Sequence, residues 1–214
     1  MWIRRSSVTL VSLVLVAGGC ARTSPEPSGS AAGSSDLAPA PVAVSGSAGC
    51  SSLPSRNPAG RDGRDANGEG GGVRVLPDLS LRCLTSQEEV RLRDLGGRAM
   101  VVNLWATWCG PCRAEMPMLQ AAHDDLGGQV AFLGVGTKDP STVAGPFLEE
   151  VGVRYPQVVD PAAELLRATQ VPGLPVTLFL APDGEIVDQH IGRLDRDTLD
   201  ELVAKILEDA ASRH

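Results

Sequence analysis

The sequence predicts an α/β domain in which some strands pair in parallel and an antiparallel hairpin closes the sheet. Two near-continuous apolar runs, at 99–107 ("AMVVNLWAT") and 129–136 ("QVAFLGVG"), are typical of strands buried on both faces. Segments with helical spacing alternate with the strands, a pattern that favours parallel pairing. Near the C-terminus, Asp183-Gly184 separates two strand-like runs and is a strong signal for a tight hairpin turn.

Residues 1–19 have the features of an export signal. A basic start precedes an apolar run at 8–17, which has the length of a signal peptide and is short for crossing a bilayer. The run ends in "AGGC", which resembles a bacterial lipobox, although Ala17 stands where leucine is usual. This resemblance implies that Cys20 becomes the lipid-bearing N-terminus, anchored to the outer face of the cell membrane; an ordinary secretory signal is the alternative. Either route leads to an extracytoplasmic compartment, which permits disulfides.

Residues 20–72 are expected to form a flexible tether. They are rich in Ser, Gly, Ala and Pro, and their apolar content is too low to offset the entropy of ordering. The folded domain is expected to occupy residues 73–214. The net charge of −7 and the pI near 5.0 argue against a nucleic-acid partner.

The first half of the domain is expected to alternate between strands and helices. Short alternating apolar runs on both sides of "TSQ" predict a hairpin at 73–93. The buried strand at 99–107 is followed by apolar residues at helical spacing, which predict a helix at 110–126. The second buried strand, at 129–136, precedes a helix at 141–151.

The second half continues the alternation with shorter elements. "YPQVVD" predicts a short strand and "AAELLRATQ" a short helix. Strands at 175–182 and 185–192 form the hairpin with the Asp-Gly turn. An amphipathic helix at 195–211, with Asp195 at its start, ends the domain.

The stretch "TWCGPC" at 107–112 predicts a redox-active cysteine pair. Cys109 would lie at the helix start, where unsatisfied N–H groups and the helix dipole favour a thiolate and lower its pKa. The thiolate is the form that attacks a disulfide. Cys112 lies one turn further on, close enough to resolve the mixed disulfide, and Pro111 fits the first turn because its missing N–H costs little there.

Other uses of the cysteine pair fit less well. Zinc needs about four ligands, whereas the chain has no second C-x-x-C and its three histidines are scattered. No metal or other cofactor is therefore expected, although two thiolates alone could hold Cu(I), and a copper carrier stays an alternative. A purely structural disulfide at this spacing closes too small a loop to stabilise the fold much.

The segments "VVNLWATWCGPCRAEMP" and "VPGLPVTLFLAPDGEIV" resemble the thioredoxin superfamily, and specifically its extracytoplasmic TlpA/ResA-like branch. The likeness covers residues from about 74 to 210. It implies a thioredoxin fold, a central sheet flanked by helices, with an N-terminal β-hairpin extension at 73–93 and a central insertion at about 140–170.

The resemblance also implies roles for individual residues. Cys109 matches the nucleophilic cysteine of the family and Cys112 the resolving one. Pro175 matches the proline whose preceding peptide bond is cis and which faces the cysteine pair. Leu174 would offer backbone groups to an extended substrate segment, and Trp108 would lie beside the active site; a core or surface aromatic is the alternative for Trp108.

Proton handling differs from that of cytoplasmic thioredoxins. Asn103 stands where those proteins carry a buried aspartate, and the extracytoplasmic branch commonly has asparagine there. The branch often has a glutamate three residues after the second cysteine, and Glu115 matches that place. A partly buried Glu115 could take the proton from the resolving thiol; a solvated helix glutamate is the alternative.

Cys50 and Cys83 remain once Cys20 and the active pair are set aside. A disulfide between them would tie the tether to the hairpin and close a loop of about thirty residues, worth roughly 3–4 kcal/mol in the chain-entropy model. Two free thiols are the alternative, but they are uncommon in an oxidising compartment.

These features predict a membrane-tethered thiol–disulfide oxidoreductase. The resemblance suggests a reductase of disulfides in exported proteins such as apocytochrome c, recycled by a membrane electron donor of the CcdA/DsbD type. An oxidant that forms disulfides in secreted proteins and a Cu(I)-handling lipoprotein are the alternatives. A peroxidase is excluded, because "NLWATWC" lacks the proline and threonine that the peroxiredoxin signature places before a lone reactive cysteine.

Overall fold

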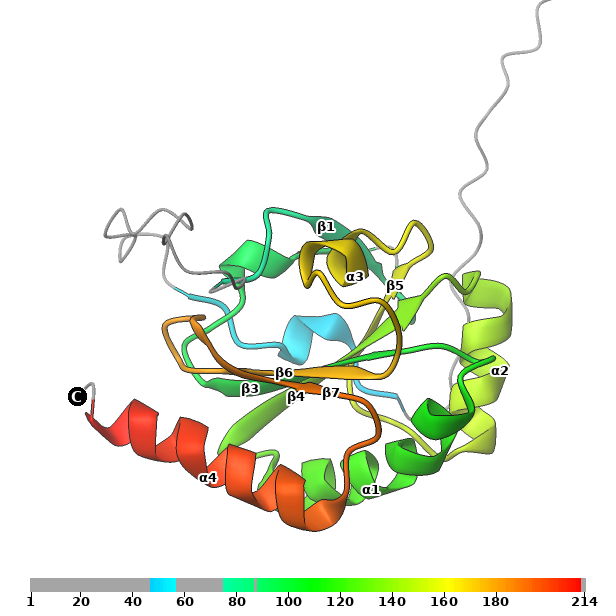
Figure 1. Ribbon diagram of the computed structural model, residues 1–214. Coiled ribbons are helices and arrows are strands. Elements are labelled where there is room, and N and C mark those ends of the chain that lie inside the picture. Colours follow the sequence, from blue (N-terminus) through cyan, green and yellow to red (C-terminus); the bar gives the residue numbers. More distant parts are fainter. Residues whose placement is uncertain (1–46, 57–74, 87, 213–214) are drawn as a thin grey trace, which may run out of the picture. The chain divides into compact units, whose positions relative to one another are not determined.

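The computed structural model describes residues 47–56, 75–86 and 88–212 (Figure 1). All of them belong to the unit Ala38–His214. The expected export signal and Cys20 lie outside the described residues. Among the helices that the structure describes, none combines the length and the apolar character needed to cross a membrane.

The described chain forms one mixed sheet, as the sequence predicts. Its seven strands lie in the order β2-β1-β5-β4-β3-β6-β7. Their bounds are β1 Ser80–Cys83, β2 Glu89–Arg91, β3 Ala99–Trp105, β4 Val130–Thr137, β5 Gln157–Asp160, β6 Val176–Leu180 and β7 Ile186–Ile191. The three strands β3, β4 and β5 run parallel, and the strands at both edges pair antiparallel. The predicted α/β class with a closing hairpin is confirmed.

β3 explains why the central apolar run is nearly continuous. All seven of its residues are buried, because both faces of the sheet are covered. Successive side chains point to opposite faces, so Val101 and Trp105 join one core while Val102 and Leu104 join the other. The indole N–H of Trp105 donates to Oε1 of Gln157 at 2.9 Å, which satisfies its one polar group inside the core.

In the part of the chain that the structure describes, helices lie on both faces of the sheet (Figure 1). They are α1 Gly110–Leu126, α2 Ser141–Glu150, α3 Glu164–Ala168 and α4 Arg196–Ser212. The apolar sides of α1, α2 and α4 pack into the core on one face, and α3 packs on the other face. The bounds of α1 coincide with the prediction, and the ends of α2 and α4 differ from it by one residue.

Residues 47–56 correct the expected boundary of the tether. Cys50–Ser52 form a short 3-10 helix, and Ser55 makes an isolated β-bridge with Leu95. Cys50 is buried in the core that contains β1 and is bonded to Cys83. This segment is therefore ordered before residue 73, because a covalent bond and a few packed residues offset the entropy that its composition alone could not.

Candidate active site

The cysteine pair lies at the N-terminus of α1, directly after the turn that leaves β3. Cys109 is the N-cap of this helix, with extended backbone angles, and its sulfur accepts a hydrogen bond from the Cys112 N–H at 3.3 Å. The place of the cap means that the free N–H groups and the positive end of the helix dipole face this sulfur. The predicted place of Cys109 at the helix start is confirmed, and these groups would stabilise a thiolate formed there on reduction.

The two cysteines differ in accessibility. They form a disulfide in this structure. Cys109 retains 5% of its accessible surface and Cys112 retains none. A substrate sulfur can therefore reach Cys109, whereas Cys112 can react only with the Cys109 sulfur. This difference suits Cys109 to attack the substrate and Cys112 to resolve the mixed disulfide.

Pro175 lies at the start of β6, beside the strand that leads to the cysteines. The Leu174–Pro175 peptide bond is cis, as the resemblance implies. The carbonyl of Pro175 accepts a hydrogen bond from Gly192 N–H at 2.9 Å, and the next residue, Val176, pairs with Leu104 of β3. Leu174 thus stands at the same end of the sheet as the active pair.

Trp108 points away from the core. Its side chain is 62% exposed, although large aromatic side chains are usually well buried. A core role is excluded by this exposure. The flat, exposed ring directly before Cys109 is suited to contact a docked polypeptide.

Glu115 is buried inside the domain and is not a solvated helix glutamate. It is 1% exposed; Oε1 accepts from Nδ2 of Asn103 at 2.9 Å and Oε2 accepts from the Leu194 N–H at 2.8 Å. Burial raises the pKa of this carboxyl, and these two hydrogen bonds, with the charges of His190 and Arg193, lower it in part. Because Glu115 follows Cys112 by three residues on α1 and both are buried, the two lie on one face of the helix.

Asn103 links this carboxyl to the proline strand. Its Nδ2 also lies 3.1 Å from Oγ1 of Thr177, two residues after Pro175. These two hydrogen bonds of Asn103 connect β3 to α1 through Glu115 and to β6 through Thr177. The position that carries aspartate in cytoplasmic thioredoxins thus serves here as a neutral donor to Glu115.

Asp139 is a further site residue that the sequence reasoning did not single out. It lies between β4 and α2, is 3% exposed, and accepts two hydrogen bonds from Thr107. The Thr107 N–H lies 2.5 Å from Oδ2 and its hydroxyl 3.0 Å from Oδ1. Asp139 thereby holds the loop two residues before Cys109. No local signal in the sequence marks Asp139 as a site residue, because its partner Thr107 lies more than thirty residues away along the chain.

Replacing Asp139 by alanine is expected to destabilise the domain by about 1–3 kcal/mol, because the Thr107 donors lose their acceptor in a largely buried place. Urea unfolding followed by circular dichroism measures the change. The matched control is Glu208→Ala, which removes an exposed carboxylate on α4 and should stay within about 0.5 kcal/mol. Equal losses for the two variants would contradict the assigned role.

Cys50 and Cys83 are joined by a disulfide in the structure, the pairing that the sequence favours. They lie 33 residues apart, and both are buried, at 4% and 2% exposure. The bond fixes the segment before the domain to β1. Because Cys50 and Cys83 are bonded to each other in the core, Cys109 and Cys112 are the candidate redox-active pair among the cysteines that the structure describes.

Within residues 47–56, 75–86 and 88–212, no group of three or more His, Cys, Asp or Glu side chains could hold a metal ion.

A C-x-x-C pair that caps a helix after a buried parallel strand, with a cis proline on the adjacent strand, defines a thioredoxin-like thiol–disulfide exchange enzyme. Residues 74–189, more than half of the 214-residue chain, match the AhpC/TSA family, and the chain belongs to that family.

Curated relatives and solved structures agree with this class. The thiol-disulfide oxidoreductase ResA of Oceanobacillus iheyensis is 33% identical over 132 residues, which cover 59% of this chain and 68% of the relative. ResA of Halalkalibacterium halodurans is 29% identical, covering 64% and 74%. A structure assigned as a DsbE thiol:disulfide interchange protein from Chlorobium tepidum has a TM-score of 0.57 at 26% identity, covering 64% of this chain and 96% of that one. The chain is a ResA-like thiol–disulfide oxidoreductase.

Proposed function

We propose that this oxidoreductase is an extracytoplasmic reductase of disulfides in exported proteins, with apocytochrome c as a substrate. The observation that supports it most is the asymmetry of the pair, in which Cys109 is the accessible helix cap and Cys112 is fully buried. Thiol–disulfide exchange in either direction needs one cysteine that meets the substrate and one that meets only the mixed disulfide, and the reducing direction is inferred from the resemblance to the TlpA/ResA-like branch.

The reaction transfers two electrons to the substrate. The Cys109 thiolate attacks one sulfur of the substrate disulfide, which forms a mixed disulfide and releases the other substrate sulfur as a thiolate. Glu115 takes the proton of the Cys112 thiol, and the resulting thiolate attacks the Cys109 sulfur. The second substrate thiolate leaves, and the enzyme retains the Cys109–Cys112 disulfide. A membrane electron donor of the CcdA/DsbD type then reduces this disulfide.

The proposed location rests on two features. The buried Cys50–Cys83 disulfide suits an oxidising compartment. The export signal at 1–19 supports passage across the cytoplasmic membrane, and lipid on Cys20 would hold the protein at the outer face of that membrane through the tether at 20–72. Because residues 47–56 pack against the domain, a shorter part of the chain separates Cys20 from the domain.

A peptide assay tests the substrate. The purified protein is reduced, freed of reductant and mixed with a peptide that carries an oxidised C-x-x-C-H segment. We expect one peptide disulfide to be lost for each Cys109–Cys112 disulfide formed, as counted by mass spectrometry. A peptide in which alanine replaces the histidine is the matched control. Net oxidation of the reduced peptide by the oxidised protein, with no reaction in the reverse sense, would contradict the proposed direction.

The Glu115→Gln variant should lower the rate constant for peptide reduction by roughly 10²-fold, the lower range for lost general base catalysis. Glu115 accepts a proton only when ionised, and its pKa is raised by burial. The rate of the native protein should therefore rise as pH increases through this raised pKa, and the variant should lack that rise. Stopped-flow rates between pH 4 and pH 9 measure both effects; a variant with an unchanged pH profile would exclude the role.

A further inference from the structure

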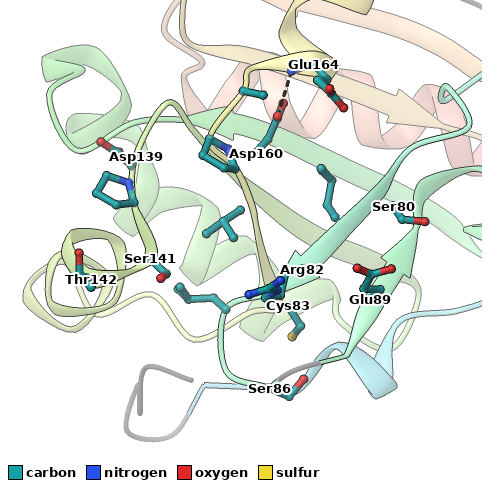
Figure 2. A pocket seen from close by; sticks show the side chains of 16 residues that line it. Ser80, Arg82, Cys83, Ser86, Glu89, Asp139, Ser141, Thr142, Asp160 and Glu164 are labelled. Atoms are coloured by element: carbon teal, nitrogen blue, oxygen red, sulfur yellow. Dashed lines mark hydrogen bonds between the residues drawn. The ribbon is translucent and has the colours of Figure 1, made fainter. Parts of the chain in front are cut away.

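A pocket of about 520 Å³ lies between the β1–β2 hairpin and the loops that begin α2 and α3 (Figure 2). This volume is within the range of sites that bind small ligands or side chains. Apolar groups of Leu81, Leu84, Val159 and Ala162 form much of its wall. The hairpin and the insertion that the sequence adds to the core therefore build the pocket together.

The pocket borders the loop that carries the nucleophile. Asp139 lines it and also binds both the N–H and the hydroxyl of Thr107. Thr107 precedes Cys109 by two residues, which span at most about 7 Å of chain. The pocket edge thus lies roughly 10 Å from the reactive sulfur, a distance that about three residues of an extended polypeptide cover.

The walls of the pocket carry an excess of negative charge. Four carboxylates line it, those of Glu89, Asp139, Asp160 and Glu164, against the single guanidinium of Arg82. Figure 2 shows Arg82 on β1 beside Glu89, the residue opposite it in the register of β2.

Among the residues that the structure describes, the two buried carboxylates, Asp139 and Asp160, accept hydrogen bonds only from neutral groups. Asp139 binds Thr107, and Asp160 accepts the N–H groups of Glu164 and Leu165, at 2.9 Å each. In the part of the chain that the structure describes, no lysine or arginine forms an ion pair with any of the four carboxylates. An occupant with positive charge would therefore complement this pocket.

We propose that the pocket docks the polypeptide substrate outside its disulfide. It takes an apolar side chain and an adjacent lysine or arginine, about three to five residues from the attacked cysteine. The long apolar stem of a lysine can lie along Val159 and Ala162 while its ammonium group reaches the carboxylates. This inference rests on the proposed function, because it names a substrate feature that the same cysteine pair would act on.

The test uses three disulfide peptides and the purified, reduced full chain. One peptide carries Lys-Leu four residues before an oxidised C-x-x-C, the second carries Glu-Leu there, and the third is cut short at the first cysteine. The second-order rate constant for oxidation of the protein by each peptide is measured. We expect the Lys-Leu peptide to react about tenfold faster than the Glu-Leu peptide, and this ratio to shrink in high salt.

Two substitutions and their controls locate the effect. Ala162→Phe fills the pocket and should reduce the tenfold ratio to near one, whereas Ala204→Phe, at an exposed position of α4, should keep it. Glu164→Gln should lower the ratio about threefold, and Glu208→Gln, also exposed on α4, should not.

The outcomes separate this proposal from the function on which it rests. Equal rate constants for the two long peptides, or a ratio that survives Ala162→Phe, would overturn the docking site while leaving the reductase intact. If none of the peptides, the short one included, oxidised the reduced protein, the proposed function itself would fall and the docking site with it.

Discussion

Replacement of Cys109 by serine is expected to lower the rate of disulfide exchange by roughly a thousandfold or more, as the loss of an activated nucleophile does in other enzymes. Cys109 is the N-cap of α1 and the cysteine of the pair that retains exposure. A serine hydroxyl at this cap would still accept the N–H of residue 112, so the fold should persist. Stopped-flow kinetics with a disulfide peptide measures the loss, and the circular dichroism spectrum checks the fold.

Replacement of Cys112 has a different expected outcome, which makes it the matched control. Cys109 can still attack, but no buried thiol is present to release the substrate. The Cys112→Ser variant should therefore accumulate a covalent mixed disulfide through Cys109, visible as an added peptide mass under non-reducing conditions. If the peptide were trapped through any other cysteine, or if the Cys109→Ser variant trapped as much peptide, the assignment of Cys109 as the nucleophile would be contradicted.

Removal of the second disulfide should have the largest effect on stability. The double variant Cys50→Ser/Cys83→Ser frees a loop closed across 33 residues. The chain-entropy model gives a loss of about 3–4 kcal/mol in the free energy of unfolding. For a domain of this size the melting temperature should fall by roughly 10 °C.

The stability measurement needs a readout for the active pair as well. Urea unfolding gives the change in free energy, and the rate of reaction with a short disulfide peptide should stay within about twofold, because Cys50 and Cys83 lie in the core on the other face of the sheet from Cys109 and Cys112. A free energy of unfolding unchanged within about 0.5 kcal/mol would show that the bond does not hold segment 47–56 against the domain.

The strands and helices near the active site were well predicted by local patterns. β3 is buried on both faces, so its apolar run is unbroken and visible in the sequence. α1 begins at the cysteine pair and ends before Gly127-Gly128, and both ends have local signals. The hairpin of β6 and β7 follows from Asp183-Gly184, whose glycine has a φ of +80°.

What could not be predicted depends on contacts between distant segments. Asp139 belongs to the site only because β4 lies beside β3, which brings Thr107 within hydrogen-bond distance. The burial of Glu115 depends on the Leu194 loop, 79 residues away. The composition of 20–72 suggested a tether throughout, whereas its part at 47–56 packs against the domain. Local sequence patterns do not show which distant segments come into contact.

The most direct test of the account is the reduction potential of the Cys109–Cys112 pair. The full chain is equilibrated in glutathione or dithiothreitol buffers, and the oxidised fraction of this pair is counted by mass spectrometry after alkylation. The account predicts a value near or below about −250 mV, in the range of reducing thioredoxins. A value near about −120 mV would contradict it and make the protein an oxidant that forms disulfides in secreted proteins.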